Sequence, residues 1–191
     1  MIAARRAVPV LNPYLDLHHA IIQSVIQPES VARIRKKLVA AYAWAIPSRE
    51  ALELLADHGP LLELGAGTGY WAHCLKQVGV DIIAWDRNPG APPHWTEVVA
   101  GEPHLLSDPA SPHHARTLFL CWPPLNEPMA AEAVKLYRGG TLAEIGEARD
   151  GCTGSEAFYD ELERNWRLTH ELPLPRWPGI EDSLRIWQRA E

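Results

Sequence analysis

A buried strand that runs directly into a glycine turn constrains this chain more than any other stretch. Residues 60–70 read PLLELGAGTGY, and the leucines give the near-continuous apolar run of a strand buried on both faces. Glycine then occupies every second position of residues 65–69, and apolar residues recur at helical spacing from Trp71 to Val78. A strand, a tight turn and a helix in this order bring backbone N–H groups and the positive helix end to a ligand. The stretch predicts a cofactor loop in an α/β sheet.

The spacing of the glycines indicates which cofactor the loop holds. The dinucleotide fingerprint needs glycine in the pattern G-x-G-x-x-G, and the last position counted from Gly65 is Tyr70. A tyrosine is too large for the close helix–strand packing that this last glycine permits. The spacing therefore disfavours a pyrophosphate ligand.

The pattern Glu63-x-Gly65-x-Gly67-x-Gly69 resembles the first motif of the class I S-adenosylmethionine-dependent methyltransferases. The resemblance implies that the loop holds the methionine part of the cofactor and that Glu63 holds its amino end. A second acidic residue is expected at the end of the next strand, where it binds the ribose hydroxyls, and Asp86 occupies that place. A nicotinamide-binding fold would also use Asp86, so an oxidoreductase stays open as an alternative.

Strands and helices alternate from residue 60 onward, which predicts a parallel sheet with helices on both faces. Two last strands have no helix between them and should pair antiparallel. The expected strands are residues 60–64, 81–86, 95–100, 117–122, 141–145, 168–174 and 183–189. A reversed final hairpin is typical of the methyltransferase fold. The resemblance implies a single Rossmann-like methyltransferase domain over residues 59–191, with a seven-stranded, mostly parallel sheet in the order 3-2-1-4-5-7-6 and the last strand antiparallel.

The predicted cofactor site is completed at the carboxyl ends of the neighbouring strands. In many family members an acidic residue after the third strand binds the adenine amino group, and Glu102 is the candidate here, with Asp108 second. Trp71 and Trp85 fall near the same edge and are expected to line the site. The predicted cofactor-binding residues are Glu63, Gly65, Ala66, Gly67, Thr68, Gly69, Trp71, Trp85, Asp86 and Glu102.

The fourth strand ends at the position that borders the acceptor in this topology. Residues 122–125 read WPPL, whereas family members that methylate amino groups carry Asp or Asn, two prolines and an aromatic residue. Only the prolines are kept, so an N-methyltransferase that acts on nucleic acid through this degenerate motif stands as an alternative. The predicted catalytic residues are Trp122, which walls the acceptor pocket, and Glu147, the acid–base candidate after the fifth strand, with Asp150 in reserve.

Residues 1–58 are expected to form a helical cover over the site. Tyr42 and Trp44 lie between two predicted helices, and they either cover the ligands or anchor the helices to the sheet. The basic residues within 33–37 spread around a helix and predict a solvated surface rather than a phosphate patch. The adjacent histidines at 18 and 19 point to different sides of a helix or strand, so no metal site is predicted.

Composition narrows the function further. The net charge of −6 argues against nucleic acid as a binding partner, because its phosphates attract basic proteins. No apolar run approaches the roughly 20 residues of a membrane span, and the start of the chain lacks a secretory apolar region, so we expect a cytoplasmic protein. The three cysteines are widely spaced and predict neither disulfides nor a zinc site.

The sequence therefore predicts an S-adenosylmethionine-dependent methyltransferase that transfers a methyl group to an oxygen or nitrogen nucleophile. A small molecule or a peptide is the expected acceptor, because aromatic walls suit a flat or apolar partner. Methyl transfer from a sulfonium needs mainly positioning, so the lack of a His–Asp pair does not count against activity. A relative that binds the cofactor without transferring the methyl group is the remaining alternative.

Overall fold

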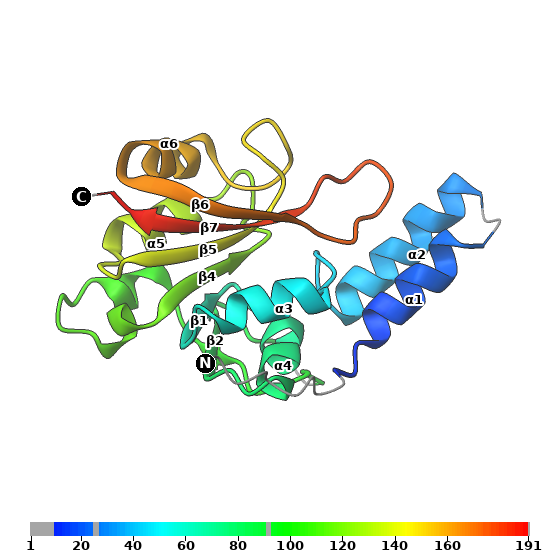
Figure 1. Cartoon of the computed structure of the whole chain (residues 1–191), viewed down its shortest axis with the longest axis horizontal. Coiled ribbons are helices and arrows are strands. Elements are labelled where there is room, and N and C mark those ends of the chain that lie inside the picture. The colour runs from blue at the N-terminus through cyan, green and yellow to red at the C-terminus, as the bar shows by residue number, and fades with distance from the viewer. Residues whose placement is uncertain (1–9, 25–26, 91–92, 191) are drawn as a thin grey trace, which may run out of the picture.

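A seven-stranded sheet runs through the computed structural model, which describes residues 10–24, 27–90 and 93–190 (Figure 1). The strand order is β3-β2-β1-β4-β5-β7-β6. The strands from β3 to β5 pair in parallel, and β7 runs antiparallel to both β5 and β6. The strands are β1 (Leu61–Leu64), β2 (Ile82–Asp86), β3 (Val99–Ala100), β4 (Thr117–Cys121), β5 (Thr141–Gly146), β6 (Trp166–Pro173) and β7 (Ser183–Arg189). The predicted order and the reversed last strand are both confirmed.

Helices cover both faces of this sheet, as predicted. One hydrophobic cluster joins α3 and α4 to one face, and a second joins α5 and α6 to the other. In Figure 1, α3 and α4 lie below the sheet and α6 lies above it. The α-helices are α1 (Pro13–Ile22), α2 (Pro28–Ala41), α3 (Arg49–Ala56), α4 (Tyr70–Gln77), α5 (Met129–Leu136) and α6 (Glu156–Asn165), with short 3-10 helices at Pro103–Leu106 and Pro112–Ala115.

The strands at the centre form where the sequence supplies continuous apolar runs. All four residues of β1 are buried, and four of the five residues of β4 are buried as well. Strands buried on both faces in this way belong to the middle of a parallel sheet. Ser48 caps α3 with its side chain, because its oxygen accepts from the Ala51 N–H.

The third strand is much shorter than expected. Only Val99–Ala100 pairs with β2, whereas residues 95–98 leave the sheet. The Trp95 N–H donates to the Thr68 carbonyl, and the Trp95 ring stacks on Tyr42. The segment therefore packs against the glycine loop instead of extending the ladder.

The first two helices form a hairpin that extends away from the sheet, beside the far end of α3 (Figure 1). Tyr14 of α1 is fully buried where this hairpin meets the rest of the chain, and its hydroxyl accepts from the Trp177 indole. The Tyr70 hydroxyl of α4 donates to the Asn12 side chain, which caps α1. These contacts fix one end of the hairpin beside the start of α4. Within the described residues, no helix has the length and hydropathy that crossing a bilayer requires.

Candidate functional site

The glycine loop connects β1 to α4 through three residues in the left-handed backbone region. Gly65, Gly67 and Gly69 have φ values of 83°, 54° and 75°, which residues with a side chain adopt only at a cost. The loop is held against β2, because the N–H groups of Gly65 and Ala66 both donate to the Trp85 carbonyl. A Cβ added at Gly67 would meet no atom within 4 Å, so this residue faces open space.

Glu63 places a buried carboxyl group beneath this loop. The residue is 1% exposed and lies near the Ala72 N–H in the first turn of α4. One of its oxygens, Oε2, is buried without a hydrogen-bond partner among the described residues. Burial raises the pKa of Glu63 to about 8, and the nearby Asp86 carboxylate adds to this rise. An unpaired buried acceptor of this kind favours a cationic donor as its ligand.

Asp86 ends β2 on the other side of the loop. Its Oδ2 accepts from the Gly67 N–H at 2.9 Å, and its Oδ1 accepts from the Asn88 N–H at 2.8 Å. The carboxylate thereby fixes both the glycine loop and the turn after β2. The sequence-predicted pair of acidic residues, Glu63 and Asp86, thus flanks Gly67.

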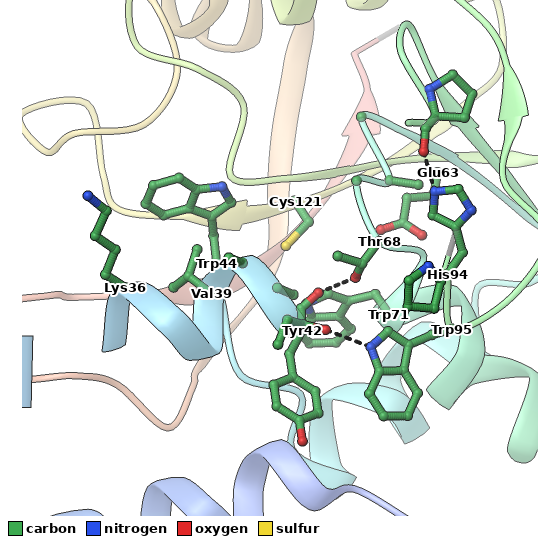
Figure 2. Close-up of a pocket in the computed structure, with 18 of the residues that line it drawn as sticks. Lys36, Val39, Tyr42, Trp44, Glu63, Thr68, Trp71, His94, Trp95 and Cys121 are labelled. Atoms are coloured by element: carbon green, nitrogen blue, oxygen red, sulfur yellow. Dashed lines mark hydrogen bonds between the residues drawn. The ribbon is translucent and has the colours of Figure 1, made fainter. Parts of the chain in front are cut away.

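Two adjoining cavities open at this edge of the sheet. The larger has a volume of about 1320 Å³ and lies between α2, the turn after it and the glycine loop (Figure 2). The smaller has a volume of about 400 Å³ and lies over the carboxyl ends of β2 and β4. Small-molecule sites usually measure roughly 300–1,000 Å³, so the two together can hold a cofactor and an acceptor. The cavities share Trp44, Gly65, Gly67, Asn88 and Cys121.

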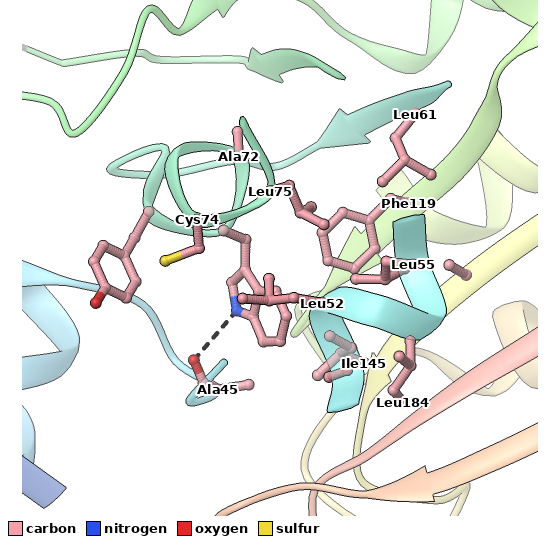
Figure 3. Close-up of a cluster of buried hydrophobic side chains, with 14 of the residues drawn as sticks. Ala45, Leu52, Leu55, Leu61, Ala72, Cys74, Leu75, Phe119, Ile145 and Leu184 are labelled. Atoms are coloured by element: carbon pink, nitrogen blue, oxygen red, sulfur yellow. Dashed lines mark hydrogen bonds between the residues drawn. The ribbon is translucent and has the colours of Figure 1, made fainter. Parts of the chain in front are cut away.

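Most of the predicted cofactor-binding residues line these cavities. Glu63, Gly65, Ala66, Gly67, Thr68 and Trp71 line the larger cavity, and Asp86 and Glu102 line the smaller. Trp71 does so from the edge of the core, where its indole N–H donates to the Ala45 carbonyl among the apolar side chains of α3 and α4 (Figure 3). Asp108, the second candidate for the adenine, lines neither cavity and accepts from the Ala110 N–H in an exposed turn.

Two of the predicted residues lie behind the site instead. The Trp85 ring is buried against His113, and a Cβ at Gly101 would come within 2.5 Å of it. Side chains alternate between the two faces of a strand, and the Trp85 side chain is on the face that packs in the core. Its ring therefore supports the turn that carries Glu102. Gly69 is the residue before α4, where an added Cβ would lie 2.8 Å from Val98. Its role is to permit close packing.

Comparison with known proteins agrees with this architecture. No family model matches the sequence, and no curated protein matches it. The 1,6-didemethyltoxoflavin-N1-methyltransferase of Burkholderia thailandensis is 15% identical, with a TM-score of 0.54 over 100% of this chain and 98% of that one. The magnesium protoporphyrin IX methyltransferase of Synechocystis is 11% identical, with a TM-score of 0.50 over 94% of this chain and 93% of that one.

The chain has the class I methyltransferase fold. The order of the strands, the reversed β7 and the match over the whole chain all agree on this. In the class I methyltransferase fold, the glycine loop after β1 and the end of β4 lie at the same edge of the sheet. The residues that follow β4 are therefore the next part of the site.

Trp122 occupies a strained position directly after β4. Its φ of 55° is the positive value that glycine usually supplies, and it is the one such non-glycine residue in the described part of the chain. The Trp122 N–H donates to the Ile145 carbonyl, and the indole N–H donates to Asp182 at 2.7 Å. The ring stacks on Trp44 with a centroid distance of 4.9 Å. The predicted acceptor wall is thus a pair of tryptophans, and Trp122 itself lines the smaller cavity.

Glu147 does not face this pocket, which corrects the expectation from the sequence. One carboxylate oxygen accepts from the Cys152 N–H at 2.8 Å, and the other accepts from the Glu181 N–H at 3.0 Å. The side chain therefore joins the loop after β5 to the turn between β6 and β7. It lines neither cavity, and neither does the reserve candidate Asp150. The fold after β5 turns Glu147 inward, so we assign it a structural role.

Tyr42 and Trp44, the residues proposed for the cover, have different roles. Tyr42 stacks between Tyr14 and Trp95, and its carbonyl accepts a hydrogen bond from the Thr68 hydroxyl (Figure 2). It both anchors α2 and lines the larger cavity. Trp44 remains 51% exposed at the edge that the two cavities share.

Several residues of the site were missed by sequence reasoning. Arg35 and Lys36 of α2 line the larger cavity, although their helix was expected to be a solvated surface. Trp95 lines it from the start of the segment that was expected to be a strand, and His94 lines it from the residue before that segment. The cluster of aromatic and proline residues around them was the available signal. No group of three or more potential metal ligands occurs in the part of the chain that the structure describes.

Proposed function

We propose that this protein is an S-adenosylmethionine-dependent methyltransferase that acts on an oxygen or nitrogen nucleophile of a small molecule. The observation that carries the proposal is Glu63, which lines the larger cavity and whose buried Oε2 has no hydrogen-bond partner among the described residues. A cationic amino group at this place would satisfy it. The proposal is supported by the class I methyltransferase fold, in which the glycine loop is the cofactor site.

The residues present fit the cofactor at both of its ends. Glu63 is suited to the amino group, and the open space at Gly67 leaves room for the methionine part. Asp86 and Glu102 line the smaller cavity, where carboxylates can accept from ribose hydroxyls and the adenine amino group. These residues come from β1, the loop, β2 and the segment after β3, so that four parts of the fold would hold one ligand.

The chemistry that S-adenosylmethionine supplies when bound is a methyl group on a sulfonium, which an in-line nucleophile displaces from sulfur. The protein's own task is to align the acceptor and exclude water. Alignment of two reactants is worth on the order of 7–11 kcal/mol of a barrier. The walls that would perform it are Trp44, Trp122 and Cys121, which surround the junction of the two cavities. With Glu147 bound to backbone N–H groups, we assign no general base.

A small-molecule acceptor is favoured over a macromolecule. We infer that residues 1–58 act as a cover, because α2 and the turn after it form one wall of the larger cavity. A cavity walled in this way suits a compact ligand better than a polymer. The Burkholderia thailandensis methyltransferase was crystallised with 1,6-didemethyltoxoflavin and S-adenosylhomocysteine bound, which is consistent with a small acceptor on this fold.

Isothermal titration calorimetry tests the cofactor assignment. S-adenosylmethionine should bind the wild-type protein, and Glu63→Gln should weaken binding by about tenfold or more, because a charge-assisted hydrogen bond is lost. Glu53→Gln is the matched control, since Glu53 is exposed on α3 and pairs only with Arg49 at the surface. Binding of NAD but not of S-adenosylmethionine would contradict the proposed function. Unchanged binding by Glu63→Gln would show that the site is placed wrongly.

A further inference from the structure

Arg35 is a partly buried cation whose role is not accounted for by the cofactor site described above. It lies on α2 and lines the larger cavity. Its Nε and Nη2 atoms are both buried and make no hydrogen bond to the described residues. These two nitrogens lie on the same edge of the planar guanidinium, and together they form the fork that binds a carboxylate with two hydrogen bonds. A fork left open and buried is costly unless a ligand fills it.

The surroundings of Arg35 are aromatic. The guanidinium carbon lies 5.5 Å from the centroid of the Trp122 ring and 5.8 Å from that of Trp44. Cation–π contacts of this kind hold the guanidinium in place without using its N–H donors. The Nε and Nη2 donors are therefore left without a partner among the described residues, in a side chain that lines the larger cavity.

Asp182 is a buried acidic group whose charge interacts with that of Arg35. This carboxyl is 2% exposed and accepts from the Trp122 indole at 2.7 Å, so it already has a hydrogen-bond donor. Burial raises the pKa of Asp182 to about 6, and the Arg35 charge only partly offsets this rise. Lys36 lines the same cavity and adds a second positive charge (Figure 2). Both cations lie on α2, which forms the wall of the larger cavity that is contributed by the helical hairpin, whereas Glu63 lies at the glycine loop.

We propose that the acceptor is a small planar carboxylic acid whose carboxylate is bound by the open edge of Arg35 beside Trp44 and Trp122. This inference rests on the proposed function, because it assigns the substrate class of the same site. The exposed ring of Trp44 provides a face for the planar part of the molecule. The carboxylate fixes the orientation of that part, so the nucleophile is presented toward the shared edge of the cavities. Arg35 is thus a residue that determines specificity, and it takes no part in the transfer itself.

The test compares aromatic acids with their neutral amides. Naphthoate, indole-acetate and hydroxybenzoate are each titrated, together with the matching carboxamide, with and without S-adenosylhomocysteine. The wild-type protein should bind at least one acid about tenfold or more tightly than its amide, because two charge-assisted hydrogen bonds distinguish them. Arg35→Met should lose this preference. Arg35→Lys should keep only part of it, since an ammonium carries the charge but lacks the fork.

Arg33→Met is the matched control, because Arg33 is exposed on the same helix and lines neither cavity. It should retain the preference for acids. Arg35→Met should also melt at the wild-type temperature or above it, because it removes an unpaired buried charge. A lower melting temperature would instead mean that Arg35 stabilises the fold through Trp44, Trp122 or Asp182, and would overturn the proposal.

Three further results would also overturn it. The first is that the wild-type protein binds none of the acids at millimolar concentration. The second is that Arg35→Met retains the preference for acids, and the third is that Arg35→Lys equals the wild type. Titration of S-adenosylhomocysteine alone separates this failure from that of the proposed function. If Arg35→Met loses S-adenosylhomocysteine, Arg35 holds the carboxylate of the cofactor and the acceptor assignment is wrong. If the wild-type protein does not bind S-adenosylhomocysteine, the proposed function itself fails.

Discussion

Glu63 is the residue on which the cofactor assignment depends most. Its carboxyl has a pKa raised to about 8 by burial, so it is mostly protonated at about pH 6.5. A bound amino cation would favour the ionised form. We therefore predict that S-adenosylmethionine binding at about pH 6.5 releases close to one proton from the wild-type protein. Calorimetry in buffers of different ionisation enthalpy measures this number directly.

Glu63→Gln is the control variant for the number of protons released on binding. The amide cannot ionise, so the proton release should disappear while weak binding remains measurable. Release of the same proton by Glu63→Gln would assign it to another group and contradict the role given to Glu63.

Gly67 allows the ligand space to be tested separately from stability. Gly67 and Gly79 both have a positive φ, and a Cβ would meet no atom within 4 Å at either position. Each alanine substitution should therefore lower the free energy of unfolding by about 1 kcal/mol. Only Gly67→Ala should also weaken S-adenosylhomocysteine binding, because only Gly67 lines the cavities. Equal binding by the two variants would mean that the open space at Gly67 is not a ligand site.

Residues of the glycine motif were predictable because their spacing alone fixes where they lie. Glu63 and Asp86 end or nearly end adjacent strands, so both reach the same edge of the sheet. Arg35 was not predictable in this way, because its environment depends on how α2 rotates against the loop. Glu147 was placed on the correct edge, but the path of the loop after β5 turned its side chain toward the β6–β7 turn.

At the scale of elements, the helical hairpin is attached to the glycine loop mainly through Tyr42. The ring stacks on Tyr14 and Trp95, while its hydroxyl forms no hydrogen bond with the described residues. We predict that Tyr42→Ala lowers the free energy of unfolding by about 2 kcal/mol, because a partly buried ring between two others is lost.

Tyr42→Phe is the matched variant for this measurement. It keeps the ring and should change the stability by less than about 0.5 kcal/mol. Urea unfolding monitored by circular dichroism compares the two. Equal loss in both variants would show that the hydroxyl, rather than the stacked ring, holds α2 in place.

Most elements followed from local patterns, and the exceptions have tertiary causes. The central strands carry apolar runs, and Ser48 and Ser155 cap their helices with side-chain oxygens. The third strand is shorter than predicted because Trp95 packs on Tyr42 and donates to the glycine loop instead of pairing with β2. The second helix ends at Ala41, directly before the turn that carries Tyr42 and Trp44.

The whole molecule carries several buried carboxyl groups whose pKa values are raised. Glu63, Glu144 and Asp182 have pKa values of about 8, 7 and 6 in the folded protein, and burial is the main cause in each case. These three groups therefore bind more protons in the folded state than in the unfolded state between the ordinary carboxyl range and about pH 8.

Burial lowers the pKa values of His18, His58 and His113 below 6.5, and these groups have the opposite effect at lower pH. Stability should therefore fall with pH in the upper part of the window, from about pH 6.5 to pH 8. Asp81 and Asp160 have lowered pKa values, so they affect the pH dependence of stability only in more acidic solution.

We accordingly predict that the melting temperature of the ligand-free protein decreases between about pH 6.5 and pH 8. Glu63→Gln should reduce this decrease, because one of the three groups no longer ionises. Differential scanning calorimetry across the range measures it. A melting temperature that rises steadily over the same interval would contradict the environments assigned to these three groups.

The fold as a whole was predictable because a parallel sheet with a reversed final hairpin leaves few arrangements open. The acceptor was not predictable from the sequence. Its site is lined by side chains from α2, from the turn after α2 and from the end of β4. Those contacts join parts of the chain that are far apart in sequence. Local patterns carry no information about them.

Transfer of a labelled methyl group is the most direct test of the central claim. The purified protein is incubated with S-adenosylmethionine carrying a deuterated methyl group and with the small-molecule fraction of a cell extract, and the products are measured by mass spectrometry. We predict a product that carries the label with the wild-type protein and is strongly reduced with Glu63→Gln. If S-adenosylmethionine binds but no labelled product forms in the small-molecule, peptide or RNA fractions, the protein binds the cofactor without transferring its methyl group.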